Sequence, residues 1–125
     1  MDDLLYADET HAIRGAIFDV SREMGIGFLE AVYQECLALE FARRDIPFAE
    51  HRELAIVYKG QVLETVYKPD FICFGKIIVE LKTADSLVDG HKAQVLNYLK
   101  ASRLRLGLLV NFGQPPKAII ERIVV

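Results

Sequence analysis

The sequence predicts a single α/β domain in which helices flank a mixed β-sheet. Three observations support this prediction. The chain has 125 residues, the length of one domain, and is 52% hydrophobic, so it can form a sizeable core. Two segments of helical character are followed by a run of strands, then by one more helix and two further strands. No linker, repeat or low-complexity stretch interrupts this order, so we expect one domain over residues 1–125.

Two helices are expected first. Apolar residues recur at helical spacing from Thr10 to Met24, and Gly25-Ile26-Gly27 breaks the pattern. A second helix is expected from about Phe28 to Arg44, with its end at Asp45 to Pro47. The apolar stripe expected on this second helix consists of Leu29, Val32, Cys36, Leu39 and Ala42 or Arg43.

Strands are expected in the middle of the chain. Glu53 to Tyr58 and Val62 to Leu63 flank Lys59-Gly60-Gln61, which reads as a hairpin turn. Thr65 to Cys73 and Lys76 to Thr83 are rich in β-branched and aromatic residues and form a second predicted hairpin.

One helix and two strands complete the predicted sheet. Asp89 to Ser102 has helical character, and Leu106 to Phe112 is a continuous apolar run typical of a strand buried on both faces. Gly113 to Pro116 forms a turn, and Ala118 to Val125 is the last predicted strand.

The second hairpin carries the most informative residues. Glu80 and Lys82 are two positions apart in one strand, so they share a face while Leu81 points to the other. Asp70 follows a proline in the neighbouring strand, in the pattern Pro-Asp, nine residues, Glu-x-Lys. Both carboxylates and the ammonium are thus expected on one face.

Register decides whether the carboxylates meet. A three-residue loop, Phe74-Gly75-Lys76, would pair Cys73 with Ile77 and place Asp70 directly opposite Glu80, with Cβ atoms about 5 Å apart. A two-residue loop would turn the glutamate to the wrong face.

Opposed carboxylates repel one another unless a cation lies between them. Hard oxygen ligands that leave room for water suit Mg²⁺ or Mn²⁺. The interpretation is therefore a metal site formed by Asp70 and Glu80, with Lys82 placed to contact a phosphate. The alternative is a hairpin whose charges face solvent.

Two further groups could belong to the same site. Glu30 and Tyr33 lie one turn apart after Gly27; the glutamate is either a third carboxylate for the metal or a first-turn residue favoured by the helix dipole. His91, Gln94 and Tyr98 share a helical face and form either the lining of a phosphate groove or a polar surface stripe.

The charge distribution is uneven. The net charge of −3 and the pI of about 5.6 do not by themselves indicate nucleic-acid binding, since such domains are usually basic. The N-terminus is acidic, with Asp2, Asp3, Asp8 and Glu9. Basic residues concentrate from Lys82 to Arg105, either as a basic face beside the site or as a solvated helix face.

Composition also bears on location. Cys36 and Cys73 lack metal-ligand or redox spacing, so both are expected to be small buried hydrophobes. The acidic start predicts no signal peptide, and no apolar run is long enough to span a bilayer. We expect a soluble cytoplasmic protein without membrane contact.

These residues resemble a known family. Gly27-Phe28-Leu29-Glu30-Ala31-Val32-Tyr33 is similar to the G-x-x-E-x-x-Y signature of the GxxExxY protein family. Other similar blocks are Tyr67-Lys68-Pro69-Asp70-Phe71, Val79-Glu80-Leu81-Lys82, the segment from Ala93 to Lys100, and the segment from Gly107 to Gly113. This family belongs to the PD-(D/E)xK nuclease superfamily, so the resemblance implies a restriction-endonuclease-like core with a central mixed sheet.

The resemblance implies roles for individual residues. Glu30, Asp70 and Glu80 would be metal ligands, together with the backbone carbonyl of Leu81, and Lys82 would be the catalytic lysine. Gln94 and Tyr98 match the Q-x-x-x-Y helix motif of RecB-like members, and Tyr33 and His91 would contact substrate or support the site.

The implied activity is Mg²⁺- or Mn²⁺-assisted hydrolysis of phosphodiester bonds, with DNA as the expected substrate. One rival is a catalytically silent nuclease fold that binds nucleic acid or protein; another is a hydrolase of a different phosphate ester. Because so small a chain offers little surface to grip a duplex, a homodimer or a protein partner is also considered.

Overall fold

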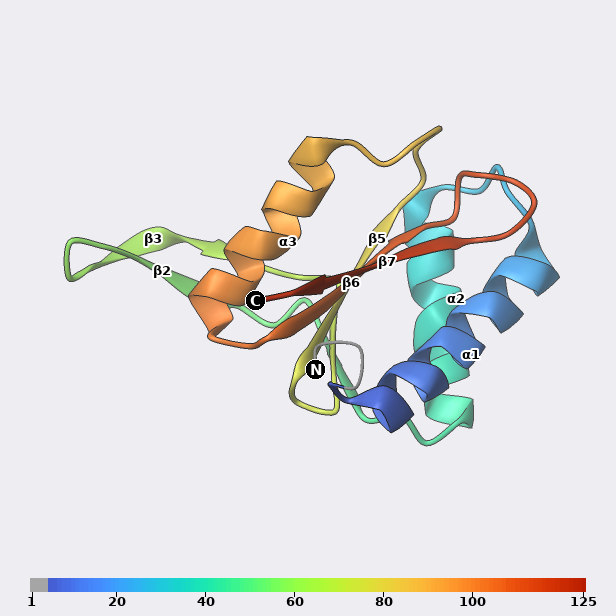
Figure 1. Cartoon of the computed structure of the whole chain (residues 1–125), viewed down its shortest axis with the longest axis horizontal. Coiled ribbons are helices and arrows are strands. Elements are labelled where there is room, and N and C mark those ends of the chain that lie inside the picture. Colours follow the sequence, from blue (N-terminus) through green and yellow to red (C-terminus); the bar gives the residue numbers. More distant parts are fainter. Residues whose placement is uncertain (1–4) are drawn as a thin grey trace.

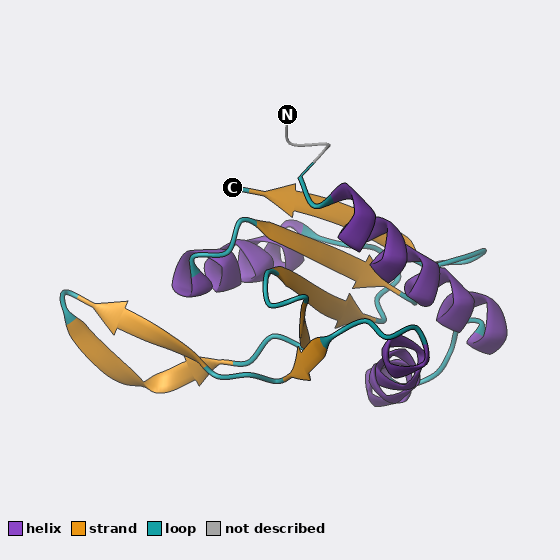
Figure 2. Cartoon of the chain, turned by 90° about the horizontal axis from the view of Figure 1, so that it is seen from below, coloured by secondary structure: helices purple, strands orange, loops and turns teal. Residues whose placement is uncertain are grey.

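The computed structural model describes residues 5–125, so the acidic residues Asp2 and Asp3 lie outside the described part. A central sheet has helices on both faces (Figures 1 and 2), which confirms the predicted α/β fold. The helices are α1 (Ala7–Met24), α2 (Glu30–Arg43) and α3 (Asp89–Ser102). The strands are β1 (Phe48–Glu50), β2 (Leu54–Tyr58), β3 (Gln61–Tyr67), β4 (Phe71–Cys73), β5 (Ile77–Lys82), β6 (Leu106–Asn111) and β7 (Ile119–Val124).

The main sheet is mixed and has the strand order β1-β4-β5-β6-β7. β5 and β6 are parallel, since α3 provides the crossover between them, whereas the other neighbouring pairs are antiparallel. β2 and β3 form a separate two-stranded hairpin, which extends from the body beside α3 (Figures 1 and 2). Within residues 5–125, no helix is long and apolar enough to cross a membrane.

The side chains of β5 alternate between two layers. Ile77, Val79 and Leu81 are fully buried in the core beneath α1 and α2, whereas Ile78 packs into the core beneath α3. Because successive side chains in a strand point to opposite faces, Glu80 takes the same face as Ile78. The fold therefore directs the predicted site toward α3.

The buried face of α2 differs from the predicted stripe. Its fully buried residues are Tyr33, Leu37 and Phe41, whereas Leu29 and Leu39 are 77% and 62% exposed. The predicted stripe was therefore wrong in its main positions. Tyr33, Leu37 and Phe41 are spaced by four residues, and two of them are aromatic, so facing them inward buries the largest apolar area.

Two strand boundaries also differ from expectation. β1 was not predicted, because a three-residue strand directly after a helix carries almost no periodic signal. The predicted strand from Thr65 to Cys73 is divided into β3 and β4. The break contains Pro69, which has no N–H to donate to a sheet ladder.

The two cysteines are free. Cys73 is fully buried, and burial raises the pKa of its thiol to about 12, while Cys36 is half-buried. Both positions agree with the expected role of small hydrophobic side chains.

Candidate active site

The loop between β4 and β5 has the predicted register. Cys73 lies opposite Ile77, so three residues separate the paired positions. Phe74 and Gly75 adopt positive φ angles of 57° and 69°, and the Lys76 N–H donates to the Cys73 carbonyl at 3.1 Å. This turn sets the alternation of every later residue in β5 and thereby the face of the sheet that the site occupies.

Beyond the paired residues of β4 and β5, hydrogen bonds between backbone and side chains replace the backbone hydrogen bonds of the sheet. The last paired residues before the site are Phe71 and Val79. Beyond them, the Asp70 N–H donates to Glu80 Oε1 at 2.8 Å, and the Leu81 N–H donates to Asp70 Oδ2 at 2.8 Å. Each carboxylate therefore binds the backbone of the other's segment, and the two acids are held together at one edge.

Glu80 is in an environment that disfavours its charge. The residue is 4% exposed, and its pKa is raised to about 8, first by burial and then by the negative charge of Asp70. Lys82 Nζ lies 4.0 Å from Glu80 Oε2 and partly opposes this shift. A second positive charge placed between the carboxylates would relieve the remaining repulsion.

Asn111 fixes the chain beyond Lys82. It is fully buried and pairs in register with Lys82. Its side chain accepts hydrogen bonds from the Ala84 and Gly113 N–H groups at 3.0 Å and donates to the Ala84 carbonyl at 2.8 Å. A Cβ at Gly113 would lie 2.5 Å from the Ala84 carbonyl oxygen, so only glycine allows this approach.

Helix α3 reaches the site through two of the predicted residues. Tyr98 Oη donates to Glu80 Oε2 at 3.4 Å, and Gln94 Nε2 donates to Tyr98 Oη at 2.9 Å. Burial, followed by the charge of Glu80, raises the Tyr98 pKa, so the phenol stays protonated and available as a donor. His91 instead accepts the Val88 N–H on Nδ1 at 3.1 Å and caps the start of α3.

Helix α2 contributes the other two predicted residues. Glu30 is its first residue; burial and then the charge of Asp70 raise the Glu30 pKa, while Lys82 lowers it. Glu30 therefore lies within electrostatic reach of the pair. Tyr33 is fully buried, so it supports the loop before α2: its hydroxyl donates to the Gly25 carbonyl at 2.5 Å, and its ring stacks on Phe112.

Two residues that the sequence did not predict contact Asp70. His51 Nε2 lies 3.4 Å from Asp70 Oδ1, and the His51 N–H donates to the Asp70 carbonyl at 3.2 Å. Gln34 Nε2 donates to the same carbonyl at 3.2 Å and to Glu50 Oε2 at 3.0 Å. Gln34 lies one turn after Glu30, a spacing that could have signalled it; nothing in the sequence signals His51.

The donor set suits a hard cation with few protein ligands. Within residues 5–125, no group of three or more histidine, cysteine, aspartate or glutamate side chains is arranged to hold a metal ion, and the role of Glu30 as a third ligand stays a prediction. Mg²⁺ commonly binds through one or two carboxylates and keeps several waters. The Asp70–Glu80 pair therefore fits a partly hydrated Mg²⁺ or Mn²⁺ ion.

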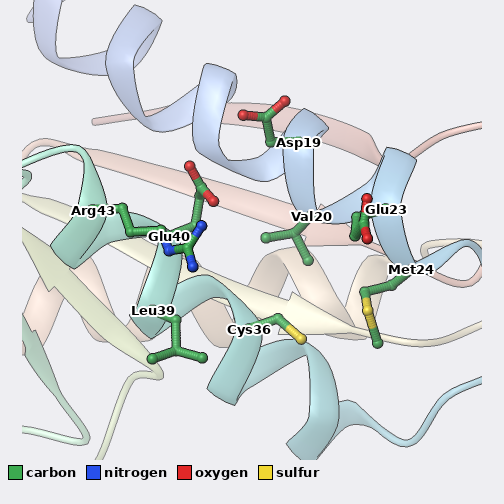
Figure 3. Close-up of a pocket in the computed structure, with 8 residues that line it drawn as sticks. All are labelled: Asp19, Val20, Glu23, Met24, Cys36, Leu39, Glu40 and Arg43. Carbon is green, nitrogen blue, oxygen red and sulfur yellow. The ribbon is translucent and has the colours of Figure 1, made fainter.

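A cavity of about 170 Å³ lies between α1 and α2, apart from these residues (Figure 3). Val20 and Met24 from α1 face Cys36 from α2 across it. None of the predicted site residues lines this cavity.

Comparisons with known proteins bear on the fold and the family of this chain. The crystal structure of SSO0001 superposes with a TM-score of 0.60 over 75% of this chain at 22% sequence identity, which shows a shared fold. The matched region covers 48% of that chain, so this protein spans about half the length of its structural neighbour. No curated protein matches the sequence. The narrower resemblance to the GxxExxY family stays a prediction. The family model described as PD-(D/E)XK nuclease superfamily matches residues 7–123, and the chain therefore belongs to that superfamily.

Proposed function

We propose that this protein is a Mg²⁺- or Mn²⁺-dependent nuclease that hydrolyses phosphodiester bonds of DNA. One observation carries the proposal. The carboxylates of Asp70 and Glu80 are each hydrogen-bonded to the backbone of the other's segment, and Lys82 Nζ lies 4.0 Å from Glu80 Oε2. Membership of a nuclease superfamily supports the same reaction class.

Asp70 and Glu80 would hold the ion through their remaining carboxylate lone pairs. The Leu81 carbonyl is a further candidate ligand, because the N–H and C=O of one strand residue point to the same side and the Leu81 N–H points to Asp70. When bound, the ion would supply Lewis-acid polarisation of the phosphoryl oxygen and lower the pKa of water.

The remaining residues act on substrate or on the ligands. Lys82 is placed to stabilise negative charge that develops on the phosphate, and its side chain is 19% exposed, so it is accessible yet partly shielded. Tyr98 and Gln94 position Glu80, Gln34 and His51 position Asp70, and Glu30 adds negative charge near both ligands.

Incubation of the purified protein with single-stranded, duplex and branched DNA tests this proposal. Cleavage should occur with Mg²⁺ or Mn²⁺ and stop with EDTA. Asp70→Asn should abolish cleavage, because one ligand charge is lost. In the same preparations, millimolar Mg²⁺ should raise the melting temperature of the wild type by mass action but not that of Asp70→Asn.

A catalytically silent binding module would give a different result. It would bind DNA without cleaving any of the three substrates in either metal. Equal metal-induced shifts of the melting temperature in wild type and Asp70→Asn would show that the ion binds elsewhere and would overturn the assigned ligands.

A further inference from the structure

A second recessed surface lies between the β2–β3 hairpin and α3. The groove has a volume of about 410 Å³, within the range of roughly 300–1,000 Å³ typical of ligand sites. The hairpin and α3 lie side by side in Figure 1. The lining residues are Ala55, Ile56, Val57 and Tyr67 from the hairpin, and Asn97, Lys100, Ala101 and Arg103 from α3 and its C-terminal end. We call this surface the hairpin groove.

The chemistry of the hairpin groove is divided between its two walls. The hairpin wall is apolar and aromatic, whereas the helix wall carries two cations, Lys100 and Arg103. The eight described lining residues include no acid. Within residues 5–125, no ion pair or side-chain hydrogen bond engages either cation. The hairpin groove thus has an apolar wall opposite two positive charges that make no ion pair in the described part of the chain.

A pair of packed tyrosines lies between the hairpin groove and the candidate active site. Tyr67 lines the groove, and its ring packs edge-on against Tyr98 with centroids 5.2 Å apart. The Tyr98 hydroxyl in turn contacts Glu80. A chain that occupies the groove would therefore pass within one side-chain layer of Glu80.

An irregularity in the hairpin shapes this groove. The β2–β3 register shifts between Ala55 and Val57, so that Ile56 faces a longer stretch of β3. Such bulges bend a strand and redirect its side chains. Ile56 lines the groove, while Val62 on the partner strand is 61% exposed.

We propose that the hairpin groove binds an unpaired nucleic-acid strand of the substrate, with phosphates at Lys100 and Arg103 and bases against Tyr67 and the apolar hairpin wall. The proposal rests on the proposed nuclease function and specifies its substrate: nucleic acid with a single-stranded segment beside the cleaved bond. Single-strand sites characteristically combine a basic groove with aromatic surfaces that stack bases.

Equilibrium binding in EDTA tests the groove independently of cleavage. Wild type and Lys100→Gln/Arg103→Gln are titrated into fluorescein-labelled oligothymidylate and into a duplex of equal length, across a series of salt concentrations. The double variant should bind oligothymidylate on the order of tenfold more weakly, and its salt slope should be less steep by about 1.4, as expected for the loss of two single-strand phosphate contacts.

The matched control is Arg43→Gln/Lys117→Gln, which removes the same charge from exposed positions at the end of α2 and before β7. It should bind oligothymidylate like the wild type. Equal weakening by both double variants, or a larger loss for duplex than for single strand, would overturn the proposal.

Polyglutamate serves as a competitor that carries charge without bases. If it displaces oligothymidylate at a comparable charge concentration, the groove is a site for acidic polymers and the proposal is wrong. Absence of cleavage with Mg²⁺ would overturn the proposed nuclease function. The binding titration in EDTA would still decide whether the hairpin groove binds a single strand.

Discussion

The two faces of the central sheet carry different kinds of residues on the same strand. Toward α1 and α2, β5 presents Ile77, Val79 and Leu81, all fully buried in one apolar core. Toward α3, it presents Ile78 followed by Glu80, whose carboxylate contacts Asp70 and Tyr98. The first face is closed by large apolar side chains, whereas the second ends in a polar cluster beside a smaller core.

Because side chains alternate along β5, the residues expected to stabilise the fold and the residues proposed to act in catalysis lie on opposite faces of the sheet. A residue on the α1–α2 face contributes buried apolar area, so its truncation should reduce folding stability. A residue at the α3 face near the strand end contributes charge to the site, and the crowding of Asp70 and Glu80 costs stability unless a cation is bound. Of two adjacent residues in β5, substitution of one should therefore lower stability, and substitution of the other should lower activity.

The largest expected effect is on the α3 face. Lys82→Ala should lower the rate of metal-dependent cleavage by about 10²–10³-fold, the scale for removing one preorganised electrostatic stabiliser. Affinity for DNA in EDTA should fall only modestly, since one cation is a small part of a phosphate-contact surface. A cleavage gel and a binding titration on the same preparations measure both effects.

The matched control is Lys76→Ala on the same hairpin, where the lysine pairs with Glu9 at 2.6 Å rather than with the site. Its cleavage rate should equal that of the wild type. A loss in Lys76→Ala as large as that in Lys82→Ala would attribute the effect to general charge and not to position.

The adjacent residue tests the other face. Leu81 is fully buried beneath α1 and α2, so Leu81→Ala should lower the free energy of unfolding by about 2–5 kcal/mol through lost burial and a residual cavity. Lys82→Ala, one residue later, should change it by only about 0.5 kcal/mol. Urea denaturation of both variants measures the contrast, and similar losses would contradict the division by face.

This division was largely predictable from sequence because it depends on spacing. The two-residue separation of Glu80 and Lys82 predicted their common face, and the expected three-residue loop around Gly75 predicted the register that pairs Cys73 with Ile77. The division of the predicted strand at Pro69 was not anticipated, although its missing N–H indicates a break.

The contacts that complete the site could not be predicted in the same way. His51 and Gln34 reach Asp70 only because β1 and α2 pack beside β4, and neither contact follows from a local period. The buried face of α2 was also predicted wrongly, because Leu29 and Leu39 fit the helical period as well as Leu37 does. Tertiary packing, and not periodicity, selected among them.

Glu80 itself should make the metal-free protein sensitive to pH. Its pKa in the folded state is raised from 4.5 to about 8, so the folded protein holds a proton that the unfolded chain releases within that window. The contribution of Glu80 to stability in EDTA should therefore be fully present below about pH 4.5 and be lost as the pH rises through about 8. Thermal unfolding at a series of pH values measures this fall.

Glu80→Gln provides the comparison, because its amide resembles the protonated carboxyl and does not titrate. This fall should disappear in Glu80→Gln. If the stability of both proteins depends on pH in the same way between 4.5 and 8, the ionisation of Glu80 is not the cause of the fall.

The smallest expected effect concerns the link between α3 and the site. Tyr98→Phe removes a hydroxyl that donates to Glu80 Oε2 at 3.4 Å, a long contact, and that accepts from Gln94. We expect kcat to fall a few-fold with KM unchanged, because Glu80 would lose orientation while substrate contacts remain, and stability to fall by about 1 kcal/mol at most. Tyr58→Phe, at the 60%-exposed tip of the β2–β3 hairpin, controls for the loss of a tyrosine hydroxyl and should leave kcat unchanged. A loss of stability in Tyr98→Phe without any change in kcat would show that the tyrosine contributes to packing alone. The residues that act in catalysis would then come from β5 and the segment before β4, and not from α3.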